Sequence, residues 1–300
     1  MRLWNPARLD PAFPPSTATL PSSHTAIPQE SLPRALPIQV YADGITHPVS
    51  AVFVDVDAST LATASDKTLV LTDVVTQRVK RRFQGHVGKI NAVANSLSAE
   101  TWLSASYDAT VRIWDGRSSY TPIQILKDAK DSVTDVHVVQ NNEESQSIIR
   151  TASVDGIVRS YDLRKGVIHC DDVKSPITGM TPTRDGQCLV ISCLDGCIRL
   201  MELESGQLLN TYKSSHVAGR YGLQCCVTAD DSTIVSGSED GSAVLYDVVR
   251  ATCVQKLTGH VKPVCSVAVH PLRAKTHAII TASYDGTATV WAHDEQFMGW

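Results

Sequence analysis

The sequence SASYDATVRIWD, residues 104–115, decides the fold. It places Asp108 in a tight turn between two short runs in which β-branched and apolar residues alternate with small or polar ones. The same pattern recurs at intervals of 40 to 47 residues. The turn aspartates of the six segments are Asp66, Asp108, Asp155, Asp195, Asp240 and Asp285. This period predicts four-stranded antiparallel blades, and therefore an all-β fold of the propeller type.

An aromatic residue follows most of these turns at a fixed distance of six residues. Trp114, Tyr161, Tyr246 and Trp291 keep the aromatic side chain, whereas Thr72 and Met201 replace it. Gly-His pairs stand at residues 85–86 and 259–260, with Ser215-His216 as a variant. With the turn aspartates, these residues resemble the WD40-repeat family over about residues 38–294.

The resemblance implies a buried hydrogen-bonded chain of His, Ser or Thr, Asp and Trp within a blade, because a buried carboxylate and imidazole are tolerated only with partners. Two sets are complete. They are His86, Ser104 or Ser106, Asp108 and Trp114, and His260, Thr281 or Ser283, Asp285 and Trp291. A third set contains His216, Asp240 and Tyr246.

A Ser, His and Asp set also invites a catalytic interpretation, because these groups perform acyl transfer when they are aligned. Here the set recurs from blade to blade, which favours a structural role. The sequence contains no phosphate-binding loop, no metal-ligand spacing and no nucleophile-elbow motif. We therefore expect a protein that is not an enzyme and that has no cofactor, catalytic residue or metal site.

The N-terminal residues suggest an incomplete blade. Residues 1–5 (MRLWN) resemble the end of a repeat strand but lack the turn and strands that should precede it. Residues 6–37 hold eight of the 14 prolines and predict a disordered insertion, with a transit peptide as the alternative. We therefore expect a seven-bladed design with six complete blades and a truncated first blade, the propeller occupying residues 38–294 and a tail occupying residues 295–300.

Composition excludes several classes of protein. The 300 residues carry a net charge of −4 and are 43% hydrophobic, without an apolar run that could span a bilayer. The eight cysteines form no Cys-x-x-Cys motif and predict reduced, mostly buried thiols. Lys80-Arg81-Arg82 is the only compact basic run and has no interleaved aromatic residue, so we expect no direct nucleic-acid binding and no membrane partner.

The loops beside the turns and the Gly-His positions predict a protein-binding surface. Rigid strands hold such loops in place, and exposed Tyr and Arg are frequent interface anchors. The candidate residues are Lys89, Tyr107, Arg220, Tyr221, Glu239, Lys262 and Tyr284.

Several stretches narrow the resemblance to one WD40 subfamily, the mitogen-activated protein kinase organiser. They are residues 66–68, 81–93, 161–164, 175–178, 184–188 and 238–241. The resemblance implies a non-enzymatic scaffold in kinase signalling, in spliceosomal messenger-RNA splicing, or in both. It further implies protein partners, a monomer within larger complexes, and a location in the cytoplasm and nucleus.

A second function remains open. Trp114-Asp115-Gly116-Arg117 and Tyr161-Asp162-Leu163-Arg164 resemble the signature of substrate receptors of cullin-RING ubiquitin ligases. In that class the arginine, here Arg117 and Arg164, contacts the adaptor subunit. An arginine is suited to this role because its planar guanidinium binds oxygen atoms in pairs.

Overall fold

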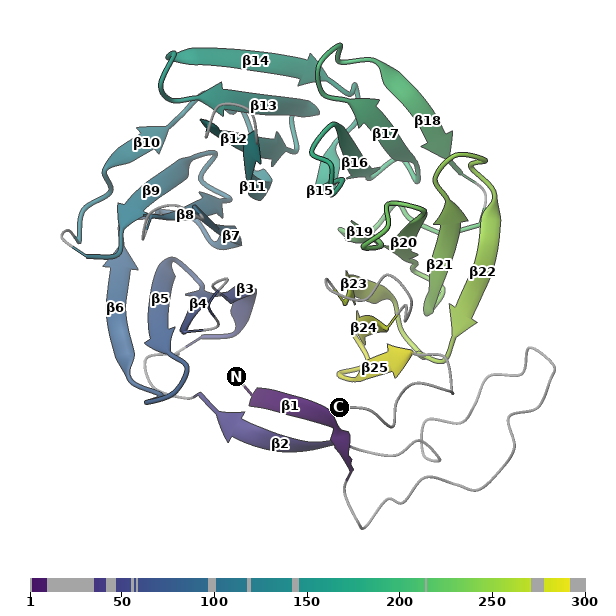
Figure 1. Cartoon of the computed structure of the whole chain (residues 1–300), viewed down its shortest axis with the longest axis horizontal. Helices are drawn as coiled ribbons and strands as arrows, with labels where there is room; N and C mark the ends of the chain where they lie inside the picture. Colours follow the sequence, from purple (N-terminus) through teal and green to yellow (C-terminus); the bar gives the residue numbers. More distant parts are fainter. Residues whose placement is uncertain are drawn as a thin grey trace. The chain divides into compact units, whose positions relative to one another are not determined.

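The computed structural model describes residues 2–9, 35–41, 47–54, 57, 59–96, 101–117, 120–141, 146–213, 215–270 and 278–291. These residues form strands β1 to β25 and the turns between them (Figure 1). The chain divides into two compact units. The first comprises Met1–Tyr41, Gly196–Leu200 and Leu208–Trp300, and the second comprises Ala42–Asp195 and Met201–Gln207.

Three consecutive four-stranded sheets lie wholly in the second unit. Blade 1 contains β3 (Val49–Val54), β4 (Thr60–Ser65), β5 (Thr68–Asp73) and β6 (Val79–Gln84). Blade 2 contains β7 (Ile90–Ser96), β8 (Thr101–Ser106), β9 (Val111–Asp115) and β10 (Gln124–Leu126). Blade 3 contains β11 (Val133–Asn141), β12 (Gln146–Ser153), β13 (Ile157–Asp162) and β14 (Val167–Asp172).

The remaining sheets repeat the pattern. Blade 4 contains β15 (Ile177–Pro182), β16 (Cys188–Cys193), β17 (Ile198–Glu202) and β18 (Leu208–Tyr212). Blade 5 contains β19 (Cys225–Val227), β20 (Thr233–Gly237), β21 (Ser242–Asp247) and β22 (Cys253–Thr258). Blade 6 is a three-stranded sheet of β23 (Val264–Val269), β24 (Ile279–Ser283) and β25 (Ala288–Trp291). In blades 1, 2, 3, 5 and 6 neighbouring strands are antiparallel.

The expectation of a seven-bladed design is wrong, because the residues that the structure describes form an all-β fold with six blades. Residues 2–9 form β1 (Arg2–Leu9), which pairs with β2 (Ala35–Val40) as a separate two-stranded sheet. Two strands do not make up the four-stranded sheet that forms each of blades 1 to 5. The expected count of six complete blades is also revised, since blade 6 has three strands within the described part of the chain.

The expected domain boundaries remain predictions. Strand β1 continues to Leu9 and β2 begins at Ala35, so strand structure extends into both ends of the 6–37 segment. Residues 10–34 and the expected tail at 295–300 lie outside the described residues.

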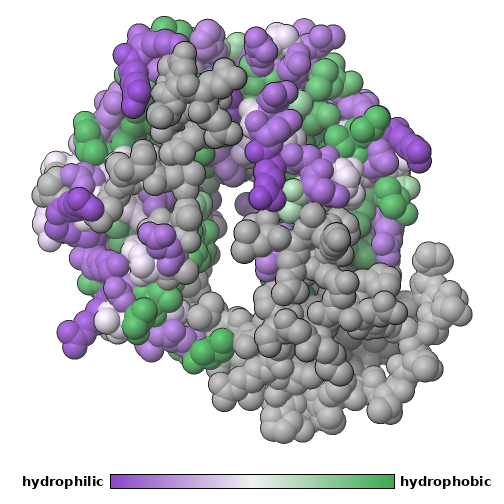
Figure 2. Space-filling model, viewed as in Figure 1, coloured by the Kyte–Doolittle hydropathy of each residue, from purple (hydrophilic) through white to green (hydrophobic). Residues whose placement is uncertain are grey.

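Alternation along the strands places apolar side chains between consecutive blades. Leu103 and Ile113 of blade 2 share a buried cluster with Val136 and Ile149 of blade 3. The outermost strands are more exposed, and hydrophilic residues mix with scattered hydrophobic ones on the surface (Figure 2). The eight cysteines are free thiols, of which Cys170 and Cys253 are exposed. Over the described residues, no helix is long and apolar enough to cross a membrane.

Candidate functional site

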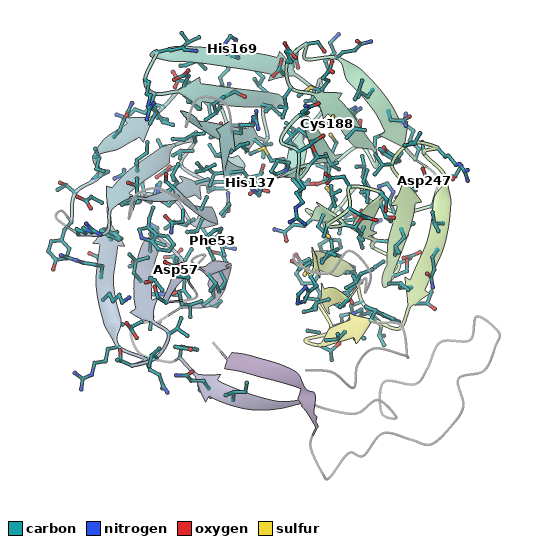
Figure 3. All side chains as sticks on the ribbon, in the orientation of Figure 1. Phe53, Asp57, His137, His169, Cys188 and Asp247 are labelled. Carbon is teal, nitrogen blue, oxygen red and sulfur yellow. The ribbon has the colours of Figure 1, made fainter. Side chains whose placement is uncertain are left out.

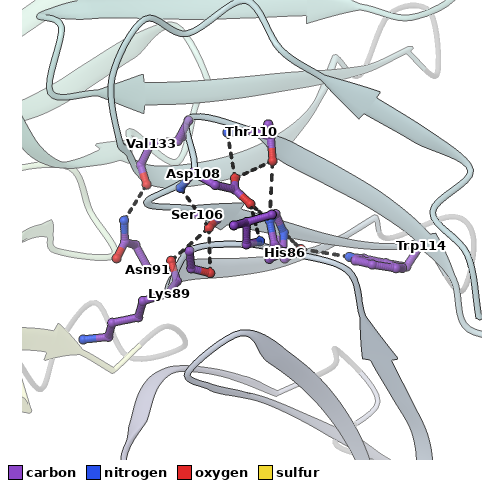
Figure 4. Close-up of polar contacts among 11 residues, drawn as sticks. His86, Lys89, Asn91, Ser106, Asp108, Thr110, Trp114 and Val133 are labelled. Carbon is purple, nitrogen blue, oxygen red and sulfur yellow. Dashed lines mark hydrogen bonds and ion pairs between the residues drawn. The ribbon is translucent and has the colours of Figure 1, made fainter.

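The turn of blade 2 carries a continuous hydrogen-bonded chain (Figure 4). Asp108 Oδ2 lies 2.9 Å from His86 Nδ1, and His86 Nε2 lies 2.7 Å from Ser104 Oγ. The Trp114 indole N–H donates to Ser104 Oγ over 2.8 Å. If the imidazole is neutral with its proton on Nδ1, every contact has one donor and one acceptor. Trp114 then donates to Ser104, Ser104 donates to His86 Nε2, and His86 Nδ1–H donates to Asp108. The geometry selects Ser104, because Ser106 donates instead to the carbonyl oxygens of Gly88 and Lys89.

Blade 6 repeats this arrangement with a threonine. His260 Nδ1 lies 3.1 Å from Asp285 Oδ2, and His260 Nε2 lies 2.8 Å from Thr281 Oγ1. The Trp291 indole N–H donates to Thr281 Oγ1 over 2.9 Å. Ser283 donates to the Lys262 carbonyl oxygen, so Thr281 is the network residue of this blade.

The third set is arranged differently. His216 Nδ1 lies 2.7 Å from the Tyr246 hydroxyl, which also accepts the backbone N–H of His216. Asp240 forms an ion pair with Lys256 and accepts a hydrogen bond from Ser242. The phenol is long enough to reach the imidazole directly, so His216 and Tyr246 pair without a hydroxyl between them.

The electrostatics of blade 2 fit a structural network. Burial lowers the pKa of His86 below its ordinary value despite the Asp108 carboxylate. Burial opposes ionisation of Asp108, but hydrogen bonds from Thr110 and His86 hold the pKa of this carboxyl well below its usual range. Ser104 is fully buried and already accepts the indole N–H. A substrate therefore has no access to this hydroxyl, and the arrangement lacks an exposed nucleophile.

Sequence reasoning missed a hydroxyl group that bonds to three of the turn aspartates. Thr110, Ser242 and Thr287 each donate to the carboxylate two residues earlier. The signal was present, because an Asp-x-Ser/Thr pattern recurs at these turns. The short side-chain bond closes the turn, and in blades 2 and 6 it occupies the carboxylate oxygen that the histidine does not use.

Blade 3 lacks a histidine in this position and uses an arginine instead. Arg159, 3% exposed, places Nη1 and Nη2 at 3.2 and 2.7 Å from the two oxygens of Asp155. This bidentate pair satisfies the turn carboxylate. The Asp-x-x-x-Arg spacing also occurs at Asp108–Arg112 and Asp195–Arg199, so the spacing alone does not indicate this pair.

The candidate partner-binding residues fall into two groups. In the second unit, Tyr107 is 69% exposed and its backbone N–H donates to the carbonyl of the exposed Lys89. In the first unit, Tyr221 and Tyr284 are both exposed, with ring centroids 5.3 Å apart and an interplanar angle of 44°. Glu239 Oε1 accepts the backbone N–H groups of Arg220 and Tyr221, which anchors the loop that carries them. Lys262 is exposed, and its carbonyl oxygen accepts a hydrogen bond from Ser283, beside Tyr284.

The two ligase-signature arginines are exposed, and their backbones are part of turns. Asp115 Oδ1 accepts the backbone N–H of Arg117, and Asp162 Oδ1 accepts that of Arg164. The same turn forms at Asp73 and Asp247, where Val75 and Val249 occupy the arginine position. The aspartate of the signature is therefore explained by turn geometry alone.

The basic run on β6 is partly neutralised by contacts that the sequence did not suggest. Lys80 forms an ion pair with Asp73, and the Arg81 guanidinium lies 4.9 Å from the centre of the Tyr120 ring. Arg81 also donates to the Arg117 carbonyl oxygen. In the described ranges, no group of three or more His, Cys, Asp or Glu side chains is arranged to hold a metal ion.

Comparison with known proteins agrees with this geometry. The family model "WD domain, G-beta repeat" matches residues 77–115, 206–247 and 251–292. Each match begins near the outer strand of one blade and continues through three strands of the next. A repeat in the sequence is therefore offset by one strand from a blade in the structure.

The similar proteins include WD-repeat proteins and an autophagy protein. The WD repeat domain-containing protein 83 homolog of Dictyostelium discoideum is 32% identical over 266 residues, 80% of each chain. WD repeat domain-containing protein 83 of Rattus norvegicus is 43% identical over 150 residues, 50% of this chain and 45% of that protein. Autophagy-related protein 16 of Arabidopsis thaliana is 23% identical over 211 residues, 69% of this chain and 40% of that protein. The chain thus spans about half the length of the rat relative it matches.

These names include no enzyme, and WD40 propellers are in general non-catalytic scaffolds that bind proteins. The repeated turn network, the blade topology and the long match to the Dictyostelium protein agree with one another. This chain is a WD40-repeat protein and belongs to the family of WD repeat domain-containing protein 83.

Proposed function

We propose that the protein is a non-enzymatic scaffold that binds other proteins through the loops around Tyr221 and Tyr284. The observation that carries the proposal is the exposed pair of tyrosine rings on a loop held by Glu239. Tyrosine contributes a large contact area while losing little conformational entropy, and anchored aromatic side chains dominate many interfaces.

Kinase signalling and messenger-RNA splicing are the two settings that we propose for this scaffold. Their support is the sequence resemblance to the mitogen-activated protein kinase organiser, which covers short stretches in blades 1 to 5. Partners from a kinase cascade or from the spliceosome would place the protein in the cytoplasm and the nucleus.

Affinity purification with quantitative mass spectrometry tests the proposal. The bait is the full chain, compared with Tyr221→Ala/Tyr284→Ala and with the control Tyr120→Ala, which removes an exposed tyrosine elsewhere. We expect the wild type and the control to recover kinase-cascade or splicing proteins. The double variant should recover at least tenfold less of one of these two groups of proteins. Equal recovery by all three baits, with unchanged melting temperatures, would reject the Tyr221 and Tyr284 surface.

A ligase receptor is the second candidate, supported by the exposed Arg117 and Arg164 at matching turns of adjacent blades. This function predicts that the cullin adaptor co-purifies with the chain. Arg117→Ala/Arg164→Ala would then abolish the association, whereas Tyr221→Ala/Tyr284→Ala would leave it intact. Absence of the adaptor from wild-type purifications would eliminate this candidate.

A further inference from the structure

The loop between β9 and β10 of blade 2 carries a threonine followed by a proline, Thr121-Pro122. Thr121 is exposed, and Tyr120 before it is 64% exposed. The loop ends at Ile123, whose backbone N–H donates to the Ile113 carbonyl oxygen over 2.7 Å. The threonine therefore lies on an anchored surface loop, where another protein can reach it.

The chain contains two other Ser/Thr-Pro pairs, and both are less accessible. The serine of Ser175-Pro176 is 6% exposed. The threonine of Thr181-Pro182 lies within β15 and is only partly exposed. The sequence alone does not distinguish the three pairs, whereas the fold leaves Thr121 as the exposed acceptor among them.

A proline directly after a hydroxyl residue suits one class of protein kinase. Proline restrains the residue before it to an extended backbone, the form in which a peptide enters a kinase active site. Proline also has no backbone N–H that would be left without a partner there. Proline-directed Ser/Thr kinases select this pair of residues.

Arg81 on β6 reaches the same loop. Its guanidinium lies 4.9 Å from the centre of the Tyr120 ring and donates to the Arg117 carbonyl oxygen, and both of these groups are uncharged. The side chains of Arg82 and Arg117 are exposed. A phosphate on Thr121, one residue after Tyr120, would enter this basic surface. Guanidinium groups bind phosphate oxygens through charge-assisted hydrogen bonds.

We propose that a proline-directed Ser/Thr kinase phosphorylates Thr121 and that Arg81 then binds the phosphate. The Thr121 Oγ1 forms a bond to the γ-phosphorus of ATP, the bond from this phosphorus to the β,γ-bridging oxygen breaks, and ADP leaves with that oxygen. The hydroxyl proton passes to the catalytic carboxylate of the kinase. The phosphate adds a charge of about −1.5 to −2 at pH 7, which offsets the positive charge of this surface. The modification is independent of the Tyr221 and Tyr284 surface.

Phosphorylation of the full chain by purified cyclin-dependent and mitogen-activated protein kinases, with ATP and Mg²⁺, tests the site. Mass spectrometry of the digested product locates the phosphate. We expect it on Thr121, and we expect at least tenfold less phosphate in Thr121→Val and in Pro122→Ala. Ser175→Ala should be phosphorylated like the wild type.

Synthetic peptides that span the three Ser/Thr-Pro pairs separate the preference of each kinase from the effect of the fold. We expect the peptides of Ser175 and Thr181 to accept phosphate although these residues do not accept it in the folded chain. Two results would overturn the proposal. One is a Thr121 peptide that no kinase accepts, and the other is a Thr121 peptide that is accepted while the folded chain is not.

Phosphorus NMR of the phosphorylated chain tests the role of Arg81. A cation beside a phosphate favours the dianion, so the second pKa of phosphothreonine should lie below its ordinary value of about 6. Arg81→Gln should raise this pKa by about 0.5, whereas Arg81→Lys should retain most of the effect. Arg164→Gln, an exposed position of blade 3, should leave the pKa unchanged. Equal pKa values in Arg81→Gln and the wild type would show that Arg81 does not bind the phosphate.

Discussion

At the scale of the residue, the structure shows how a buried carboxylate and imidazole are tolerated in an apolar sheet. Each polar atom of the blade 2 network has a partner within 3 Å, from Asp108 through His86 and Ser104 to Trp114. Loss of one member leaves its neighbours desolvated and unpaired, which costs more than the bond itself contributes.

The carboxylate of Asp108 should therefore matter for stability. We expect Asp108→Asn to lower the free energy of unfolding by about 1–3 kcal/mol, because the amide weakens the bonds to Thr110 and His86. Thermal denaturation measures the effect, with the exposed Glu204→Gln as a control for loss of charge. Identical melting curves for Asp108→Asn and the wild type would contradict a stabilising network.

The pH dependence of stability should reveal the buried imidazole. Burial lowers the pKa of His86 below its ordinary value of 6.5, so the unfolded chain binds protons more strongly. The contribution of His86 is thus complete above pH 6.5 and is lost as the pH falls through 6.5 toward the folded pKa. We expect His86→Gln to reduce the stability difference between pH 7.5 and 5.5, whereas exposed His169→Gln does not. An unchanged difference in His86→Gln would contradict this assignment.

Blade 3 places polar residues on its three inner strands at the register position where blade 2 has the apolar Ala94, Leu103 and Ile113. His137, Arg150, Ser160 and His169 occupy matching register positions on its four strands, with His137 and His169 on the two edge strands (Figure 3). Arg150 is 5% exposed, and its Nε and Nη1 atoms have no hydrogen-bond partner in this part of the chain. Burial lowers the pKa of this guanidinium, since Asp171 only partly offsets its desolvation.

Replacement of Arg150 should stabilise the protein. Arg150→Leu introduces the residue found at the matching position 103 of blade 2. We expect a gain of about 1–3 kcal/mol in chemical denaturation, because a desolvated, unpaired group is removed. Arg159→Leu is the matched control and should destabilise, since it breaks a complete ion pair with Asp155. A loss of stability in Arg150→Leu would show that the guanidinium has a stabilising partner.

At the scale of the element, the hairpin turn of blade 5 is both a local motif and a contact with the next blade. Gly241 and Gly286 follow the turn aspartates of blades 5 and 6 with similar φ angles of 82° and 84°. Glycine is favoured at such angles because it has no Cβ. The two positions differ in their surroundings, since the His260 carbonyl faces Gly241, whereas no described residue lies within 4 Å of a Cβ added at Gly286.

Alanine substitution separates these two effects. Gly286→Ala should cost about 1 kcal/mol from backbone strain alone. Gly241→Ala should cost at least about 2 kcal/mol, because its Cβ must also displace the His260 carbonyl from 2.5 Å. Paired thermal unfolding curves measure the difference. Equal losses would mean that the turn of blade 5 does not pack on the following loop as described.

At the scale of the whole molecule, the repeat allowed the all-β fold and its blades to be predicted from the sequence. The number of blades was not predicted correctly, because a strand-like N-terminal sequence cannot reveal whether it joins a four-stranded sheet or pairs separately as β1–β2. The Asp155–Arg159 pair and the Tyr221–Tyr284 contact depend on which side chains meet in three dimensions. Residue types and spacing therefore identified candidate residues but not their partners.

A scaffold must hold two partners at once, and sequential affinity purification tests this most directly. The chain and one recovered partner would carry different tags and be purified in two steps. We expect a second partner to elute from the second step, and Tyr221→Ala/Tyr284→Ala to lose the partner bound at these tyrosines. If the second step contains only the chain and its tagged partner, for every partner tested, the protein binds its partners one at a time and is not a scaffold.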